Sequence, residues 1–160
     1  MFREIRRKKQ LLPEETAVEM LQRNTSGTLA LLGDDDYPYA VPLSFIYLNG
    51  KLYFHSAKNG HKIDAVRNYE KASFCVIDRD QIVPEKFTTH YRSVIAFGKV
   101  RLIEDVEEMR SIATALAMKY SRDFAEQIPN EFKAYVNNLV IIEMTLEHMT
   151  AKGALNLANI

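Results

Sequence analysis

Short apolar runs alternate with polar positions along much of the chain, in the two-residue period of half-buried β-strands. Clusters of Gly, Pro, Asn and Asp, which favour turns, separate these runs. The pattern predicts strands at residues 28–32, 39–48, 51–56, 72–77, 88–102 and 139–146. Asn49-Gly50 lies directly between the second and the third strand, and this dipeptide is a strong signal for a tight hairpin. We therefore expect these two strands to pair antiparallel.

Apolar residues recur at helical spacing in four other segments. In the first, Pro13 precedes two glutamates at the helix start, and the residues from Asn24 onward end it. The others cover residues 61–69, 104–120 and 129–138, while the polar residues 78–86 are expected to be irregular. Strands joined mostly by hairpins, with helices over the ends, favour a closed or nearly closed antiparallel barrel. The prediction is a mainly β protein with flanking helices.

Composition narrows the class of protein further. The 160 residues are 47% hydrophobic and 26% charged, which fits one soluble domain over residues 1–160, with an N-terminal arm at 1–12 and a weakly patterned C-terminal tail at 150–160. Basic and acidic residues number 21 each, so no overall charge attracts nucleic acid. No apolar run reaches the ~20 residues of a membrane span, and no secretory signal is recognisable. We expect a cytoplasmic protein with neither nucleic acid nor membrane as a partner.

Most common catalytic and metal-binding signatures are missing from the sequence. The four histidines include no i, i+4 pair on a helix and no HExxH motif, so no metal site is expected. Cys75 lies in an apolar strand, where a thiol is usually inert. There is no Gly-x-Ser-x-Gly elbow, dinucleotide fingerprint or Walker sequence, so nothing supports hydrolase chemistry.

The segment from His55 to Asp64 is the strongest candidate for a binding site, because it joins a strand end to a helix start. A helix N-terminus presents unpaired N–H groups and positive potential, and so attracts phosphate. Lys62 lies in the first turn of that helix, beside an end that is itself positive. A bound anion would explain a lysine at this position, and Ser56 would donate a further hydrogen bond to the anion. The alternative is a solvated loop before a helix, and the residues alone leave both interpretations open.

Aromatic residues are concentrated around the predicted hairpin. They are Tyr37, Tyr39, Phe45, Tyr47, Tyr53 and Phe54. Strand alternation sends about half of them into the core, which is the simpler explanation. A planar heteroaromatic ligand with a phosphate tail would use the same surface.

Four segments, in this order and spacing, resemble the flavin-binding split-barrel superfamily of pyridoxamine 5'-phosphate oxidase-like proteins. Within it they are most similar to the Nim-type branch, named for 5-nitroimidazole resistance. The segments are Tyr37–Phe45, Leu52–Ala57, Gly60–Ile63 and Thr88–Gly98, and the resemblance covers residues 1–149. It implies a six-stranded antiparallel split β-barrel that forms a homodimer with two FMN molecules at the subunit interface.

The resemblance also implies roles for individual residues. Lys62 would hold the FMN phosphate, with His61 in the place of a second basic residue. Ser56 and the backbone around His55 and Ala57 would complete the phosphate site. The isoalloxazine ring would be lined, largely through main-chain groups, by Pro42, Leu43, Ser44 and Phe45, and Ser93 would approach the ring or the phosphate from the neighbouring strand.

These features predict an FMN-dependent oxidoreductase that reduces small electron-poor organics such as nitroimidazoles and nitroaromatics. His55 is the candidate catalytic residue, because nitro reduction consumes protons as well as electrons. One alternative is a non-enzymatic flavin- or haem-binding protein on the same barrel, with His55 or His61 as the iron ligand. Another is a small-molecule site without flavin, in which Lys62 faces solvent. The C-terminal tail lacks the arginine with which vitamin B6 oxidases bind the phosphate of their substrate, which argues against vitamin B6 as the substrate. We assign no role to Lys152.

Overall fold

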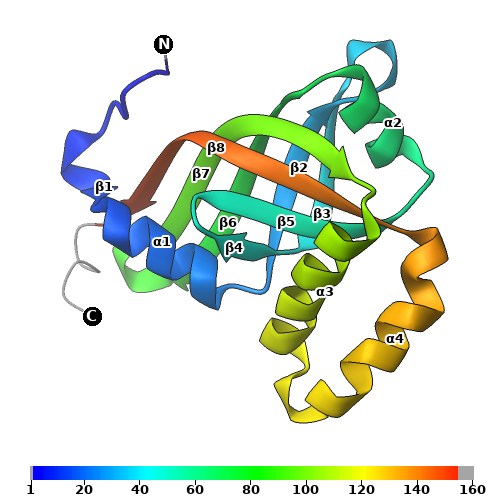
Figure 1. Cartoon of the computed structure of the whole chain (residues 1–160). Coiled ribbons are helices and arrows are strands. Elements are labelled where there is room, and N and C mark those ends of the chain that lie inside the picture. The colour runs from blue at the N-terminus through cyan, green and yellow to red at the C-terminus, as the bar shows by residue number, and fades with distance from the viewer. Residues whose placement is uncertain (1, 155–160) are drawn as a thin grey trace.

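An antiparallel sheet that curls into a barrel occupies the centre of the computed structural model, which describes residues 2–154 (Figure 1). Its strands are β1 (Leu11–Leu12), β2 (Ser26–Leu32), β3 (Pro38–Ser44), β4 (Ile46–Leu48), β5 (Lys51–Ala57), β6 (Lys71–Val83), β7 (Thr88–Ile103) and β8 (Leu139–Gly153). They are hydrogen-bonded in the order β3-β2-β6-β7-β8-β5-β4, and β1 pairs with β8. β3 also contacts β5, which brings the two ends of the sheet together. The mainly β barrel expected from the sequence is confirmed, but the described residues form eight strands where six were expected.

Four helices surround this barrel. They are α1 (Glu14–Arg23), α2 (His61–Asn68), α3 (Val106–Tyr120) and α4 (Ile128–Tyr135). Figure 1 shows α1 and α2 at opposite ends of the barrel and α3 and α4 diverging below it. A short 3₁₀ segment, Arg122–Gln127, connects α3 to α4. Within residues 2–154 no helix has the length and apolar character needed to cross a bilayer.

The barrel interior is filled by the inward-facing side chains of the strands together with apolar residues of α1 and α2. Three phenylalanines lie at its centre. The ring of Phe74 meets the rings of Phe45 and Phe54 edge-on, with centroid distances of 4.9 and 5.1 Å. All three are at most 1% exposed, and burying each contributes about 1.5–3 kcal/mol.

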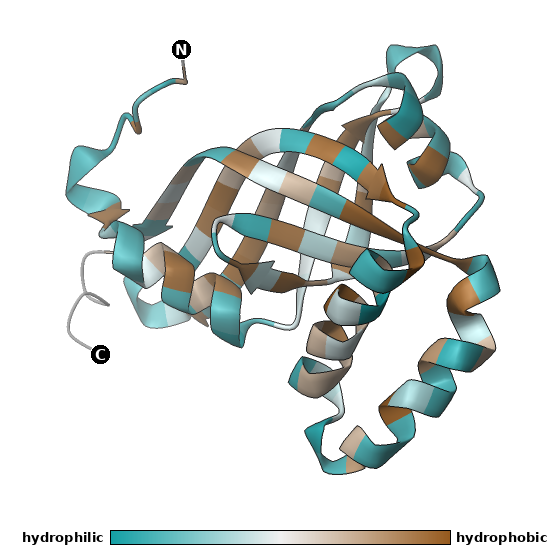
Figure 2. Ribbon diagram, viewed as in Figure 1, coloured by the Kyte–Doolittle hydropathy of each residue, from teal (hydrophilic) through white to brown (hydrophobic). Residues whose placement is uncertain are grey.

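A second core lies on the outer face of the barrel, under α3 and α4. Ile141 of β8 and Ile103 of β7 pack there against Met109 and Leu116 of α3 and Phe132 of α4. Figure 2 accordingly shows brown at the end of β8 that lies next to α4. β8 is therefore buried on both faces over part of its length, which is why residues 140–142 are all apolar.

The carboxylate of Glu143 interrupts the apolar run of β8 although its side chain is only 3% exposed. It accepts a hydrogen bond from Arg101 at 2.7 Å and pairs with Lys51 at 3.1 Å. Burial would raise the pKa of Glu143, but these two partners outweigh burial and hold that pKa below its usual value. The paired cations make the burial of this charge tolerable.

The predicted tight hairpin forms between β4 and β5. Asn49 and Gly50 have φ angles of 48° and 79°, as a two-residue turn with two left-handed positions requires. Leu48 and Lys51 pair directly across the turn.

Two strands approach each other closely at Gly98, where an added Cβ would lie 2.1 Å from the carbonyl oxygen of Thr145. Only glycine fits at this point, which coincides with a register shift between β7 and β8.

Several strand boundaries differ from the sequence prediction. The predicted strand 39–48 is divided at Phe45 into β3 and β4, and the segment expected to be irregular is largely the extension of β6 to Val83. Polar residues suit this extension because Asp80 and Gln81 are exposed on it, and a register shift after Ile77 breaks the alternation. β8 reaches Gly153, so the first residues assigned to the C-terminal tail belong to a strand, while residues 155–160 lie outside the described part.

Candidate functional site

A cavity of about 850 Å³ opens where the ends of β3 and β5 meet, beneath α3 and α4. β3 contributes Ser44, and β5 contributes His55, Ser56 and Ala57. The opposite wall comes from α3, the connecting 3₁₀ segment and α4. Four of the residues predicted for the site from the sequence are thus neighbours in space.

The alternation of β5 explains how His55 reaches this cavity. Phe54 is fully buried inside the barrel and Ser56 is 7% exposed, whereas His55 and Ala57 lie on the outer, exposed face. Ser56 donates a hydrogen bond from its hydroxyl to the Ala57 carbonyl at 3.0 Å. The imidazole is therefore presented to the cavity from a strand whose other face is fixed in the core.

The four residues predicted to line a flavin ring are placed differently from one another. Pro42 and Ser44 lie on the exposed face of β3, and Ser44 lines the cavity. The side chain of Leu43 packs against the barrel core and that of Phe45 lies within it. Phe45 therefore offers this surface only its backbone.

That backbone is held by the C-terminal end of α3. The Phe45 N–H donates to the Tyr120 hydroxyl oxygen at 2.9 Å, and the Tyr120 hydroxyl reaches the Phe45 carbonyl at 2.8 Å. Lys119 donates from Nζ to the Phe45 carbonyl at 3.1 Å and to the carbonyl of Asn24. Burial lowers the pKa of Lys119 and raises the pKa of Tyr120. These two residues fix the break between β3 and β4, and so the position of Ser44.

Sequence reasoning missed Lys119 and Tyr120 as parts of the site. They lie 74 and 75 residues beyond Phe45 in the chain, at the end of a helix that is otherwise ordinary. Nothing in the local pattern indicates that this helix end returns to a strand break.

The N-terminus of α2 follows β5 after a short loop. Gly60 precedes the helix with a φ of 123°, and no side chain caps it. The N–H groups of Ile63 and Asp64 donate to the Gly60 carbonyl, and Lys58 N–H donates to the carbonyl of Asn138, the residue just before β8. A Cβ added at Gly60 would meet nothing within 4 Å, so the space in front of this helix end is open. Such an end suits an anion.

His61 and Lys62 begin this helix but have different surroundings. His61 stacks on Tyr39 with a centroid distance of 4.1 Å, and its Nε2 accepts from the Asp34 N–H at 3.3 Å. Its ring is thus engaged with the turn between β2 and β3. Lys62 is half-buried, and neither residue lines the cavity.

Ser93 does not line the cavity in one copy of the chain. It lies on β7 opposite Ile77 of β6 and Lys152 of β8, whereas His55 lies opposite Ile141 of β8. The register of β2 with β3 and β6, continued to Ser26, places Ser93 level with Ser44 and three strands away, about 14 Å across the sheet. A single copy of the chain does not bring Ser93 to the cavity.

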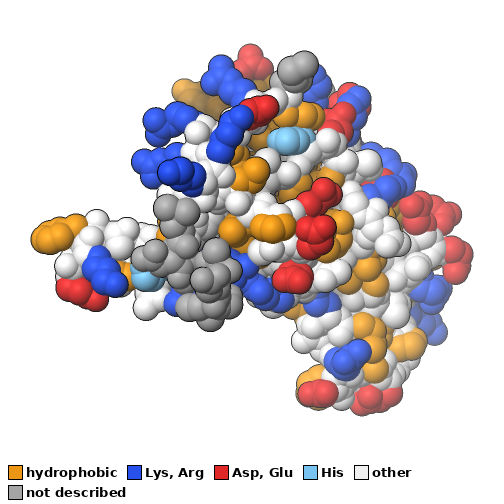
Figure 3. Space-filling view, turned by 90° about the vertical axis from the view of Figure 1, so that its left-hand side faces the viewer, with side chains coloured by type: hydrophobic (Ala, Val, Ile, Leu, Met, Phe, Trp, Pro, Cys, Tyr) orange, Lys and Arg blue, Asp and Glu red, His pale blue; other side chains and the backbone are white. Residues whose placement is uncertain are grey.

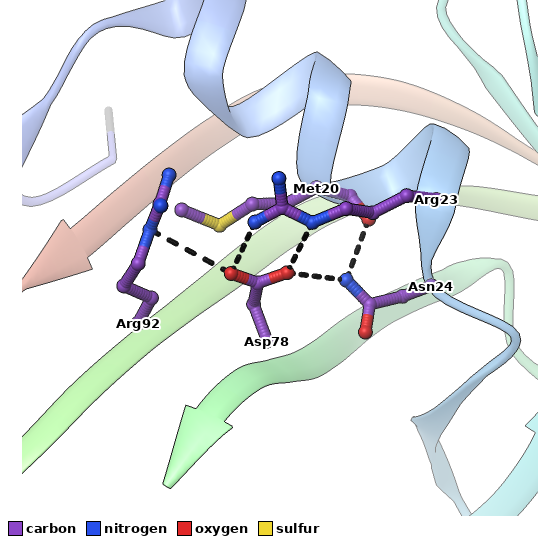
Figure 4. Close-up of polar contacts among 5 residues, drawn as sticks. All are labelled: Met20, Arg23, Asn24, Asp78 and Arg92. Atoms are coloured by element: carbon purple, nitrogen blue, oxygen red, sulfur yellow. Dashed lines mark hydrogen bonds and ion pairs between the residues drawn. The ribbon is translucent and has the colours of Figure 1, made fainter. Parts of the chain in front are cut away.

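A polar cluster outside the cavity ties α1 to the sheet (Figure 4). The Asp78 carboxylate, 5% exposed, accepts from Arg23 Nε and from Asn24 Nδ2, each at 2.7 Å, and lies 3.6 Å from Arg92 Nε. Asn24 also donates to the Met20 carbonyl at 2.8 Å. Burial would raise the pKa of Asp78, but the hydrogen bonds from Arg23 and Asn24 outweigh it, so the pKa is lowered.

Metal and thiol chemistry receive no support from the geometry. Among the described residues, no group of three or more His, Cys, Asp and Glu side chains is arranged to hold a metal ion. Burial raises the pKa of Cys75, although Lys152 acts in the opposite direction. The thiol is therefore kept protonated, as expected for an inert cysteine.

Comparison with protein-family models gives one match that spans most of the chain. The model described as pyridoxamine 5'-phosphate oxidase matches residues 13–153. A search of curated proteins found no match.

Comparison with solved structures gives matches over nearly the whole chain. A candidate 5-nitroimidazole antibiotic resistance protein from Bacteroides thetaiotaomicron is 25% identical, with a TM-score of 0.72, over 89% of this chain and 85% of that one. A conserved hypothetical protein from Mycobacterium tuberculosis is 16% identical, with a TM-score of 0.81, over 94% and 90%. An FAD- and haem-binding protein from Mycobacterium smegmatis is 18% identical, with a TM-score of 0.75, over 91% and 73%.

Proposed function

The chain belongs to the pyridoxamine 5'-phosphate oxidase family, and from that premise we propose that it is an FMN-dependent oxidoreductase of small electron-poor organics such as nitroimidazoles and nitroaromatics. The observation that carries the proposal is the cavity at the ends of β3 and β5, close in sequence to the open N-terminus of α2. A flavin mononucleotide needs both a surface for a planar ring and a site for a phosphate dianion.

The residues present fit such a cofactor. The uncapped N-terminus of α2, with open space before Gly60, suits the phosphate, and Lys62 in the first turn would neutralise it. The outer face of β3 at Pro42 and Ser44, together with the end of β5, would hold the ring. When bound, FMN supplies two-electron transfer between a reduced donor and the acceptor.

His55 has the position that a proton donor to the acceptor needs. Its imidazole is exposed on the cavity side of β5, and its strand is anchored through Phe54 in the core. Reduction of a nitro group takes up protons, so a ring N–H of His55 would donate to the nitro oxygen. Replacing His55 with alanine should leave FMN bound but slow anaerobic nitro reduction by at least about tenfold. The control His148→Ala, outside the cavity, should keep the rate, and an unchanged rate in His55→Ala would remove this role.

The proposal includes a homodimer. We assign the Ser93 contribution to a second copy of the chain, because within one copy Ser93 does not line the cavity. Apolar side chains remain exposed on the outer face of the sheet near it, with Ile77 66% and Phe97 39% exposed. Figure 3 shows such side chains among charged ones on one side of the molecule.

The absorption spectrum of the purified protein, followed through a titration with FMN, tests the cofactor assignment. We expect flavin bands and saturable binding. Lys62→Ala should weaken FMN binding by at least about tenfold, because a charge-assisted contact to phosphate is lost. Lys86→Ala, an exposed lysine at the tip of the β6–β7 hairpin, should not change it. Equal affinities for FMN in wild type and Lys62→Ala would refute the phosphate site.

Haem or flavin binding without catalysis is the second candidate function. The relative from Mycobacterium smegmatis is described as binding both FAD and haem, and the exposed His55 imidazole is a suitable axial ligand. His61 is less suitable, because its Nε2 accepts a hydrogen bond and its ring stacks on Tyr39. A Soret band on adding haem that disappears in His55→Ala would favour this function over the first.

A further inference from the structure

The cavity is lined by more than the residues assigned to a flavin. Those residues, Ser44 and positions 55–57, occupy the sheet side only. The remaining wall is formed by α3, the 3₁₀ segment after it and α4. With about 850 Å³ available, the cavity has a helix-lined half that the cofactor assignment leaves unused.

The helix-lined half has aromatic walls. Tyr120 from the end of α3, Phe124 from the 3₁₀ segment, and Phe132 and Tyr135 from α4 all line it. Aliphatic contacts come from Leu116. Aromatic side chains on three successive elements favour a flat aromatic ligand, which can stack or pack edge-on against them.

The charge of this wall is negative. Among the residues that line the cavity there is no lysine or arginine, and Glu131 of α4 supplies the carboxylate. Lys133 lies two residues along the same helix and so points to a different side. Arg110 lies over the Phe132 ring but is not a lining residue, and it pairs with Glu107 at 3.6 Å.

We propose that the helix-lined half of the cavity binds the second substrate as a planar aromatic compound that is neutral or positively charged, and that Glu131 makes this selection. The inference rests on the proposed function and adds the substrate class. An anionic ligand would meet the Glu131 carboxylate with no lysine or arginine among the lining residues to offset it, and would lose its own hydration. A cationic nitrogen compound would face both the carboxylate and the aromatic rings.

Three naphthalene probes of nearly equal shape test the selection by calorimetric titration at neutral pH and low ionic strength. They are 1-naphthylmethylammonium, 1-naphthalenemethanol and 1-naphthoate. We expect the ammonium to bind roughly threefold more tightly than the alcohol and the carboxylate to bind at least tenfold more weakly than the ammonium. Equal binding of all three, a preference for naphthoate, or no binding of any would overturn the proposal.

Variants distinguish an effect of Glu131 itself on probe binding from an effect of the overall surface charge. Glu131→Gln should weaken binding of the ammonium probe about threefold and leave binding of the alcohol probe unchanged. Glu126→Gln, an exposed acid of the preceding 3₁₀ segment that does not line the cavity, should change neither. Ala117→Leu, which narrows the cavity without altering charge, should weaken the ammonium and the alcohol alike. An effect of Glu126→Gln equal to that of Glu131→Gln would contradict a specific role.

The same titrations, repeated on protein saturated with FMN, distinguish this inference from the proposed function. If FMN binds and the ammonium preference persists, both stand. If FMN does not bind at all, the absorption spectrum shows that the cofactor assignment failed, whatever the probes do. If FMN binds but displaces the probes, the flavin fills the helix-lined half and the inference is wrong.

Discussion

At the scale of single residues, the site depends on which face of a strand each side chain occupies. His55 could be placed outward from the sequence alone, because Phe54 and the apolar residues at even positions around it must enter the core. Tyr120 could not be placed in this way. Its contact with Phe45 joins a helix end to a strand break 75 residues earlier, and no local period encodes such a contact.

Replacing Tyr120 with phenylalanine tests the importance of that contact. The variant leaves the Phe45 N–H without its acceptor, which should lower the free energy of unfolding by about 1–2 kcal/mol. Urea denaturation of wild type and variant measures the difference. Tyr135→Phe, whose residue is 64% exposed in wild type, is the control and should change stability by less than about 0.5 kcal/mol. Equal stability of the two variants would show that the clamp on Phe45 contributes little.

At the scale of elements, the strands with one buried face were the easiest to predict. Asn49-Gly50 identified the β4–β5 hairpin because few other residue pairs accept two left-handed positions. The outer part of β6 was missed, since half of its residues beyond Ile77 are exposed and a register shift breaks the period of two. The Asp78 cluster occurs at that shift and fastens the end of α1 there.

The Asp78 cluster makes stability dependent on acid pH. The folded-state pKa of Asp78 lies below its unfolded value near 3.9, so its contribution is complete above about pH 4. This contribution is lost as the pH falls towards the folded-state pKa. Asp78→Asn should lower stability at pH 7 by roughly 2–4 kcal/mol and make its decline below pH 4 shallower than in wild type. Denaturant titrations from pH 7 to pH 2.5 measure both effects.

Asp80→Asn provides the matched control for this pH series. Asp80 is exposed on the same strand, and its replacement should leave both the stability and its acid dependence close to wild type. If Asp78→Asn follows the wild-type curve at every pH, the carboxylate does not act as described.

At the scale of the whole molecule, Ser93 lies outside the cavity that Ser44 and His55 line in one copy of the chain. The sequence indicated these residues, because each belongs to a recognisable segment. It could not show that Ser93 lies outside the cavity, since that depends on the register of β7 with β6 and β8. In the proposed FMN site, a second copy of the chain supplies Ser93.

A substitution at the exposed Ile77 tests whether the dimer forms through this face, because Ile77 lies opposite Ser93 on the neighbouring strand. Ile77→Asp should convert a dimer into a monomer in sedimentation velocity and weaken FMN binding in the same samples. A charge placed on a buried apolar interface is costly, whereas on free surface it is not. Val106→Asp, at an exposed position outside that face, should remain dimeric. A monomeric wild type that binds FMN tightly would contradict the two-chain site.

The central claim is that the open N-terminus of α2 and Lys62 hold the phosphate of FMN. Calorimetric titration of the wild-type protein with FMN and with riboflavin tests it most directly, because the two ligands share the ring and differ in the phosphate. We expect FMN to bind roughly 100-fold more tightly than riboflavin, with the advantage shrinking as salt is added. Equal affinities for the two ligands, or no binding of either, would contradict it.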